Sequence, residues 1–463
     1  MNLEKKQLYK KLYKIGLPIA LENMLYSFMN FLDIFMVGTE NVALGLGQTA
    51  VAGLGLANQV FFIFMVSLFG VNSGGGILAA QYFGNGNYKK LRKVLGMTLI
   101  IGLIWGIMFT LTAIFIPDKM IRLFTENPSI IDSGSRYYRI MGLSFIFVSI
   151  GFAYNMQIRA IGEAKYSLYS SIIGILINGF LNYSLIYGHF GFKAYGIEGA
   201  AYATLIARII STIYIIAIVY IKKFPLAGNF FDMFHIPKEL VKTFIKISTP
   251  VFIHELFWVI GISIYSGIFG RYGSTSNPEV AEQAVASIQI VKSISSLMFT
   301  FLIGLASATA VIIGNEIGAG NEEKAYEDTK EIIKLTLVFA VVTSLMLYLL
   351  SPFILNLMNV KKSLYNIVTQ LLLVEGVLII GRSLSMQFIV GVLRAGGDTI
   401  WTMWVDLLTI WIFVMPLTYL TALVLYWPLP VVYFISGSDE FIKLIPCVYR
   451  FKSKKWINNF TKS

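Results

Sequence analysis

Long apolar stretches without charged residues recur along this chain, and Val94 to Ile116 is one example. The hydrocarbon core of a bilayer is about 30 Å thick, so a helix needs about 20 mostly apolar residues to cross it. Inside hydrocarbon, every backbone N–H and C=O must find a partner within the protein, and a helix provides one for each. The chain is therefore expected to be an all-α membrane protein that crosses the bilayer several times.

The apolar stretches predict twelve transmembrane helices. The composition agrees, because only 13% of the residues are charged, whereas about a quarter are charged in ordinary soluble domains. The stretch that follows the basic N-terminal residues is too long for a signal peptide and is interpreted as the first span. The expected helices lie near 14–38, 50–77, 94–117, 137–158, 166–188, 198–221, 247–270, 283–312, 333–357, 367–393, 400–421 and 428–449.

Lysine and arginine are distributed unevenly over the loops. They gather in the N-terminal tail, in the loops that follow even-numbered spans and in the C-terminal tail. The positive-inside rule therefore predicts that both termini are cytoplasmic, with the chain in the inner (plasma) membrane. The same bias accounts for most of the net charge of +12. The lipid bilayer is thus the expected partner, and no nucleic-acid partner is expected.

The two halves of the chain resemble each other. The segment QYFGNGNYKK aligns without gaps with NEIGAGNEEK in the second half. The two segments are identical at four positions, which in the first segment are Gly84, Gly86, Asn87 and Lys90. Six spans per half is an even number, so both repeats have the same orientation in the membrane. We therefore expect two pseudo-symmetric six-helix lobes, 1–230 with the N-terminal tail and 231–463 with the basic C-terminal tail.

Proline and glycine residues mark further equivalent places. Pro18 and Pro250 lie at matching positions of spans one and seven, where a proline removes a backbone hydrogen bond and bends a helix. They are expected to be hinges, or plain kinks that fix the lobe shape. The run from Gly74 to Gly76 predicts close helix packing. The glycine-rich segments lack the lysine and hydroxyl residue that end a phosphate-binding loop, so they are interpreted as capped turns.

Cysteine and histidine are too few for several kinds of site. Cys447 is the single cysteine, which excludes an intramolecular disulfide framework, and the histidines are His189, His235 and His254. Their scatter argues against a metal site or a serine–histidine–aspartate arrangement. The chain is accordingly not expected to be an enzyme or to carry a resident cofactor.

Several motifs together resemble the multidrug and toxic compound extrusion (MATE) family, in particular its bacterial branch. They are LPIALENMLYSFMNFLDIFMVG in span one, GIEGAAYAT at the start of span six, TPVFIHELFW in span seven, GVLRAGGDT after span ten and VDLLTIW in span eleven. The resemblance implies a secondary antiporter that exports cationic, amphipathic small organic molecules in exchange for Na⁺ or H⁺ by alternating access. A monomeric transporter is expected.

By the same resemblance, the cation site of the N-terminal lobe combines Asp33 with Asn178 and Asn182. The two amides are one helical turn apart and share a face. Many relatives have an acid where Asn182 stands, so one negative charge is missing here, which argues against sodium binding at this lobe. The alternative is that the amides only hold helices together by hydrogen bonds.

In the C-terminal lobe the resemblance gives Glu255 as the cation-coupling residue. The rise per residue of an α-helix places Glu255 and Lys292 at a similar depth in the membrane, so we expect them to form an ion pair. The alternative is that the Lys292 side chain extends toward the membrane–water interface. His254 is expected to pack rather than to carry protons. The other intramembrane charges are expected to be structural or coupling partners, with Arg382 bound to a carboxylate; they are Glu375, Arg382 and Asp406.

Two other functions compete with the antiporter. A lipid-linked oligosaccharide flippase of the same superfamily would need a strongly basic cleft, and the few intramembrane cations, Arg208, Lys292 and Arg382, argue mildly against it. A membrane-embedded enzyme would need a compact catalytic constellation, which the sequence does not suggest. Efflux driven by an imposed sodium or proton gradient distinguishes the antiporter from both.

Overall fold

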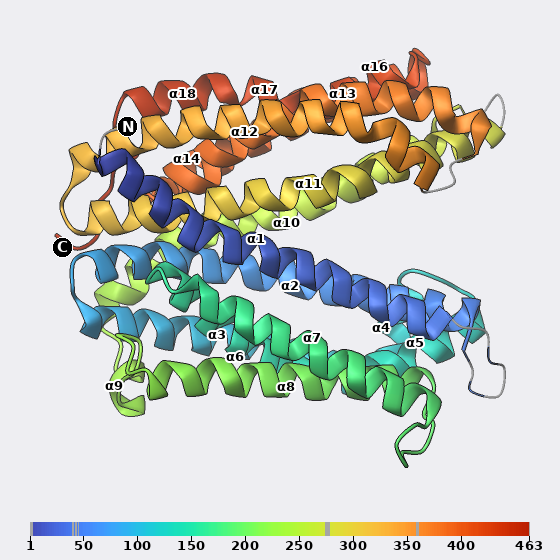
Figure 1. The fold of residues 1–463 in the computed structure, drawn as a ribbon, viewed down its shortest axis with the longest axis horizontal. Coiled ribbons are helices and arrows are strands. Elements are labelled where there is room, and N and C mark those ends of the chain that lie inside the picture. The colour runs from blue at the N-terminus through green and yellow to red at the C-terminus, as the bar shows by residue number, and fades with distance from the viewer. Residues whose placement is uncertain are drawn as a thin grey trace. The chain divides into compact units, whose positions relative to one another are not determined.

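The chain is helical in the computed structural model, which describes residues 3–38, 41, 44, 46–273, 278–357 and 361–462 (Figure 1). Each of the twelve expected spans lies on one helix or on a run of consecutive helices. Nine helices of the described residues are long and apolar enough to cross a membrane. Two further helices, Pro128–Met141 and Ser144–Ala160, are long and apolar enough only when taken together, and they are bent by 52° at the break between them. This is the expected architecture.

Contacts divide the chain into two compact units. The N-unit comprises residues 21–252, and the C-unit comprises residues 1–20 together with 253–463. This division groups residues by contact and does not test the six-helix lobes 1–230 and 231–463, which stay a prediction.

The helices of the first half of the chain are α1 (Leu3–Gly38), α2 (Gln48–Gly84), α3 (Tyr88–Phe115), α4 (Pro117–Arg122), α5 (Pro128–Met141), α6 (Ser144–Ala160), α7 (Ala164–Tyr187), α8 (Ile197–Ile221) and α9 (Phe230–Phe234). Those of the second half are α10 (Lys238–Arg271), α11 (Pro278–Gly318), α12 (Glu322–Leu357), α13 (Lys362–Met386), η2 (Gln387–Leu393), α14 (Thr399–Leu408), η3 (Thr409–Val414), α15 (Met415–Tyr419), η4 (Leu420–Val424), α16 (Leu429–Ser436), α17 (Asp439–Ile442) and α18 (Leu444–Lys452).

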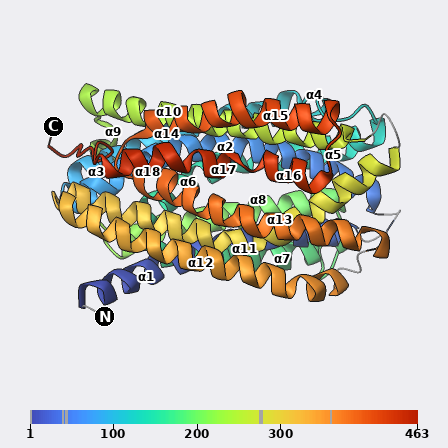
Figure 2. The ribbon, with the colours of Figure 1, turned by 90° about the horizontal axis from the view of Figure 1, so that it is seen from above.

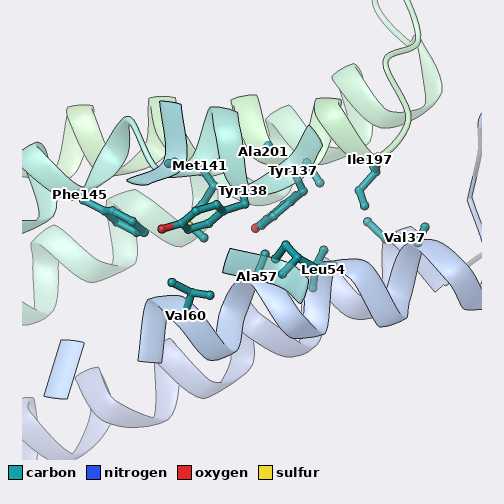
Figure 3. Packing of buried hydrophobic residues seen from close by; sticks show 14 of the residues in the cluster. Val37, Leu54, Ala57, Val60, Tyr137, Tyr138, Met141, Phe145, Ile197 and Ala201 are labelled. Atoms are coloured by element: carbon teal, nitrogen blue, oxygen red, sulfur yellow. The ribbon is translucent and has the colours of Figure 1, made fainter. Parts of the chain in front are cut away.

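Within the N-unit, a buried aromatic and aliphatic cluster holds the helices together. Tyr137 and Tyr138 of α5 face Leu54 and Ala57 of α2 (Figure 3). Phe145 of α6 extends the cluster along the same face of α2. Because aromatic side chains bury a large area and have few rotatable bonds, this cluster forms a rigid frame for the polar residues of the unit.

Within the C-unit, short helices follow one another along a long one. Figure 2 shows α16, α17 and α18 in sequence beside α13. The turn after η2 is fixed from the C-terminal side, where the Arg450 guanidinium contacts Asp398 at 2.5 Å. The Asn458 backbone N–H also donates to the Gly396 carbonyl at 2.9 Å. Helix α18 (Leu444–Lys452) and the chain downstream of it therefore hold the turn that carries Arg394.

Equivalent turns of the two halves have the same backbone conformation. Gly86 and Gly320 have φ of +75° and +84°, a left-handed conformation that glycine adopts without steric cost. The same holds for Gly162 and Gly397, at +83° and +85°. The Asn87 side chain accepts a hydrogen bond from the Lys90 N–H and caps α3. The prediction of a capped turn at Gly86 is confirmed.

Two helices contribute to both units. The contact division places Met1–Ala20 of α1 in the C-unit and residues from Leu21 onward in the N-unit. It places α10 in the N-unit as far as Phe252 and in the C-unit from Ile253. Pro18 and Pro250 lie inside these two helices, each two residues before the change of unit.

Small residues allow close backbone approach within the N-unit. A methyl group on Gly74 or Gly75 would meet Ser248 or Thr98, respectively, far inside contact distance. The close packing predicted for this run is confirmed. A methyl group on Gly53 of α2 would lie 2.6 Å from the backbone nitrogen of Gly134 on α5. The two helices can therefore contact at this height only while residue 53 is glycine.

Replacing Gly53 with alanine is expected to destabilise the protein by about 1–3 kcal/mol, because backbone atoms of α5 must move to admit the methyl group. The matched control is Gly55→Ala on the same helix, since a methyl group there meets no atom within 4 Å. Thermal unfolding of the purified protein in detergent checks this. Equal melting temperatures for the two variants would contradict the close contact of α2 and α5.

Candidate functional site

The predicted cation-site residues of the N-terminal lobe come together in the N-unit. Asp33 of α1 is 2% exposed, and Asn178 and Asn182 of α7 are fully buried. The Asn182 amide donates to the Asp33 carboxylate at 2.5 Å and to the Asn178 oxygen at 3.1 Å. Thr204 of α8 completes a ring, since its hydroxyl accepts from the Asn178 amide at 3.2 Å and donates to Asp33 at 3.5 Å. The sequence did not single out Thr204.

This ring contains one carboxylate and a nearby cation. The charge of Arg208 on α8 acts on Asp33, and its guanidinium lies over the Phe61 ring, 4.0 Å from the centroid. The Arg208 Nε is buried and has no hydrogen-bond partner. Asn182 acts as a donor to Asp33, a role that an aspartate could fill only when protonated. The ring is therefore closer to neutral than a site with two carboxylates would be.

The oxygen atoms of the ring suit a small hard cation in type but are low in charge. Carboxylate, amide and hydroxyl oxygens are the ligands that hard cations prefer, and the Asn182 side-chain oxygen is buried without a hydrogen-bond partner. Against this, Asp33 is the one acid of the ring and already accepts from Asn182. No group of three or more acidic, histidine or cysteine residues that could hold a metal ion is found within the described part of the chain.

Sequence reasoning missed a second buried charge on α1. Glu22 is fully buried, and the Arg159 guanidinium contacts it at 2.5 Å. The Ser167 hydroxyl donates to the same carboxylate at 2.7 Å. The available signal was an acidic residue inside an expected span. Because this carboxylate is already paired, it joins α1, α6 and α7 and leaves Asp33 as the freer acid.

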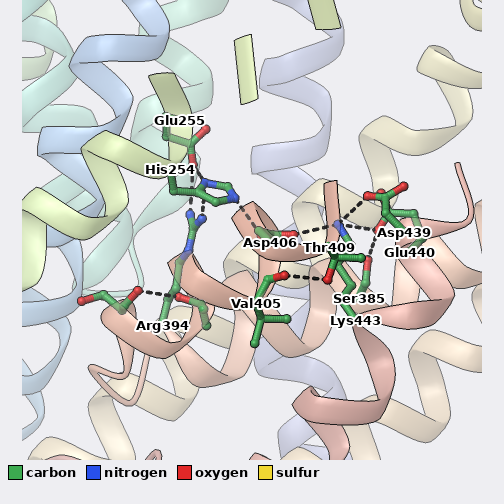
Figure 4. A network of polar contacts seen from close by, with 12 residues as sticks. His254, Glu255, Ser385, Arg394, Val405, Asp406, Thr409, Asp439, Glu440 and Lys443 are labelled. Atoms are coloured by element: carbon green, nitrogen blue, oxygen red, sulfur yellow. Dashed lines mark hydrogen bonds and ion pairs between the residues drawn. The ribbon is translucent and has the colours of Figure 1, made fainter. Parts of the chain in front are cut away.

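Glu255 lies in a network of polar side chains in the C-unit (Figure 4). Its carboxylate accepts from the Arg394 guanidinium at 3.0 Å, so the expected pair with Lys292 is wrong. Lys292 is exposed, and its charge acts on Glu375 and Arg382 instead. The sequence predicts that Arg394 lies in a turn just after a span, so it was not counted among the intramembrane charges. Its long side chain nevertheless extends from this turn to Glu255 on α10. Since Glu255 is already neutralised by Arg394, its carboxylate is not a metal ligand in this arrangement.

The expectation that His254 only packs is also wrong. Its Nε2 lies 2.7 Å from Asp406 of α14, and its Nδ1 lies 2.6 Å from an Arg394 nitrogen and 3.2 Å from Glu255. The second oxygen of Asp406 accepts from Lys443 at 2.8 Å. Both ring nitrogens and both Asp406 oxygens are thus within contact distance of polar partners.

The network continues from Lys443 to α13. The Lys443 ammonium also contacts Asp439 and Glu440, each at 3.1 Å. Glu440 accepts from the Ser385 hydroxyl and lies 3.9 Å from Arg382. The i,i+3 and i,i+4 spacing of these acids from Lys443 was a readable signal for the ion pairs.

The predicted partner for Arg382 is confirmed. Its guanidinium contacts Glu375 at 2.7 Å, and the Tyr433 hydroxyl donates to the other Glu375 oxygen at 2.9 Å. Together with the contacts to Glu440 and Ser385, this joins α13 to α16 and α17.

The carboxylates of this network outnumber its permanent cations. Its carboxylates are Glu255, Glu375, Asp406, Asp439 and Glu440. Its permanent cations are Arg382, Arg394 and Lys443. With every carboxylate ionised, two negative charges are in excess while His254 is neutral, and one remains in excess when His254 binds a proton. A proton on His254 therefore brings the network closer to balance, which is favourable because an uncompensated charge is costly away from water.

Replacing Lys443 with methionine is expected to destabilise the protein by about 3–5 kcal/mol, because three carboxylates lose their shared partner in a buried place. The control is Lys452→Met at the end of α18, where the side chain is exposed. Thermal unfolding in detergent measures the difference. A Lys443→Met melting temperature equal to that of the control would show that these carboxylates do not depend on Lys443.

The chain is similar in sequence and in structure to known proteins. The MatE family model matches residues 18–184 and 275–420. The chain is 26% identical over 401 residues to a protein of Bacillus subtilis (strain 168) named probable multidrug resistance protein YoeA, covering 85% of this chain and 82% of that protein. It is 24% identical over 426 residues to a probable multidrug resistance protein NorM of Thermotoga maritima, covering 89% of this chain and 85% of that protein.

Solved structures share the fold. The crystal structure of a MATE protein in complex with MaL6 superposes with a TM-score of 0.84 at 19% identity, covering 97% of each chain. The Vibrio cholerae MATE transporter VcmN in its bent form gives 0.85 at 15% identity, covering 98% of each chain. Identities this low support the fold alone, and the fold is the predicted all-α arrangement of twelve spans.

The family model covers well over half of the chain, and the relatives align along most of it. Members of the family are transporters and not enzymes, as the sequence predicted. The chain therefore belongs to the MatE family of multi-pass membrane transporters.

Proposed function

We propose that this protein is a secondary antiporter that exports amphipathic organic cations in exchange for Na⁺ or H⁺. The observation that carries the proposal is the ring of Asp33, Asn182, Asn178 and Thr204, a buried acid held by polar side chains in a membrane helix bundle. Burying a charged carboxylate away from water costs free energy, and the reversible binding of a cation gives a physical reason for a carboxylate at this position.

The names of the relatives support small organic molecules as the cargo, since YoeA and NorM are both named as probable multidrug resistance proteins. Amphipathic cations suit a transporter whose buried acids exceed its buried bases. The bias of lysine and arginine toward one set of loops supports cytoplasmic termini in the plasma membrane. We expect the monomer to be sufficient for transport, because the ring in the N-unit and the network in the C-unit are each complete within one chain.

Alternating access requires places where long helices can bend. Pro18 and Pro250 have no N–H to donate to the carbonyl one turn earlier, which weakens α1 and α10 locally. Each proline is followed within two residues by the change from one unit to the other. This coincidence in both helices supports the hinge role.

Efflux of ethidium from proteoliposomes tests the function directly. Wild-type protein should expel ethidium when a sodium or a proton gradient is imposed. Asp33→Asn and Glu255→Gln should each lower the rate by about tenfold or more, because each removes a charged hydrogen-bond partner worth roughly 1.5–3 kcal/mol. Exposed acids of the same types provide the controls Asp132→Asn and Glu327→Gln, which should transport normally. Failure of both gradients to drive wild-type efflux would favour the flippase.

The charge of the Asp33 ring should decide which ion it takes. With one acid and Arg208 nearby, the wild-type ring is expected to bind sodium weakly. The double variant Asn182→Asp/Arg208→Gln gains a carboxylate and loses a cation. Sodium should therefore stabilise it, by about 2.7 kcal/mol at 100 times the dissociation constant, and its melting temperature should keep rising with the logarithm of the sodium concentration.

Potassium at equal ionic strength is the matched salt for this measurement, and Arg208→Gln alone separates the two changes. An equal sodium response in wild type and in the double variant would contradict the role of ring charge.

A further inference from the structure

We propose that the imidazole of His254 is the binding site of the coupling proton in the C-unit, an inference that rests on the proposed antiport. His254 of α10 is faced by charged groups from three elements: Glu255 on its own helix, Arg394 at the end of η2 and Asp406 on α14. Lys443 stands behind Asp406 and compensates its charge. Figure 4 shows the ring between Arg394 and Glu255 on one side and Asp406 on the other.

The distances identify the protonation state that this arrangement holds. A guanidinium is always a donor, and an Arg394 nitrogen lies 2.6 Å from His254 Nδ1. Nδ1 must therefore accept, so the ring is neutral and its proton is on Nε2. Nε2 is then the donor to Asp406 at 2.7 Å. The carboxylate of Glu255, 3.2 Å from Nδ1, shares no hydrogen with it in this state and is held by Arg394 instead.

A second proton would change these partners. Once Nδ1 carries hydrogen, it opposes the Arg394 donor at 2.6 Å, and that contact becomes repulsive. The same N–H has an acceptor ready in the Glu255 carboxylate at 3.2 Å. Protonation therefore replaces the contact of His254 with Arg394 by a hydrogen bond to Glu255. The ring has two alternative sets of partners, selected by one proton.

The exchange is local and balanced. A proton from water adds to Nδ1, and it returns to water when Nδ1 loses it; no other bond is made or broken. Protonation also lowers the excess of negative charge in the network by one, which favours binding of the proton away from water. Arg394 is 2% exposed and its Nε is buried without a hydrogen-bond partner. Displacing its guanidinium thus transmits proton binding to the turn of residues 394–398, which the C-terminal residues hold.

Nitrogen-15 NMR of the labelled full-length protein in nanodiscs tests the state of the ring. The chain has three histidines, so the double variant His189→Gln/His235→Gln leaves His254 as the single histidine signal. At high pH the shifts should be those of the Nε2–H tautomer, and acidification between about pH 9 and about pH 5 should convert it to the imidazolium. An Nδ1–H tautomer at high pH, or a ring that stays unchanged over this range, would overturn the proposal.

The partner exchange has its own readout. In the same background, Arg394→Gln removes the opposing donor, so His254 should bind its proton at a proton concentration lower by about tenfold or more. Glu255→Gln replaces the charged carboxylate acceptor with a neutral amide and should have the opposite effect. No change in either variant would show that the two side chains do not compete for Nδ1.

Proton release on substrate binding tests the coupling. In weakly buffered detergent solution with a pH-indicator dye, ethidium should displace protons from wild type and from the exposed control His235→Gln, and much less from His254→Gln. If a folded His254→Gln protein released as many protons as wild type on binding ethidium, the proposal would be wrong. Absence of ethidium binding and efflux in wild type would instead count against the antiport function, and the NMR titration would still report on the ring.

Discussion

A bilayer interior does not solvate charge, and each acid or base on the long helices of this protein must find a partner inside the protein or give up its charge. The structure meets this demand differently in its two units. The N-unit pairs Glu22 with Arg159 and holds Asp33 in a ring of amides and a hydroxyl. The C-unit joins five carboxylates to a smaller number of cations in one connected network. The rest of the site chemistry follows from these pairings.

The same demand separates the charges that the fold already satisfies from those that the proposed antiport would use. Glu22 and Glu375 each have an arginine and a hydroxyl group as partners, so their charge is satisfied without any ion. Asp33 has neutral donors and a cation that acts on it without a direct ion pair. His254 shares its two nitrogens among three charged groups. The groups that are incompletely compensated are the ones to which an ion or a proton can add reversibly.

Packing makes these polar arrangements precise. Glycines such as Gly53 and Gly134 let helices approach until backbone atoms touch, and the aromatic cluster around Tyr137 and Phe145 fixes the spacing within the N-unit. In the C-unit, Arg450 and Asn458 fix the turn that presents Arg394. A hydrogen bond to a buried acid is lost with a shift of less than an ångström, so the rigid frame and the site depend on each other.

The sequence alone determined the helices, their number, the internal duplication and the family. The reason is that the length of apolar stretches, the glycine-containing turns and the short motifs are all local features of the sequence. It also brought Asp33, Asn178 and Asn182 together, since the resemblance supplied a contact between distant helices. The sequence could not identify the partner of Glu255, because depth in the membrane does not distinguish Lys292 from other cations at a similar depth. Only the tertiary structure, in which the turn after η2 folds back onto α10, places Arg394 beside Glu255. The role of His254 was likewise decided by tertiary contacts, because hydrogen bonds between distant segments depend on side-chain direction, which periodicity does not specify.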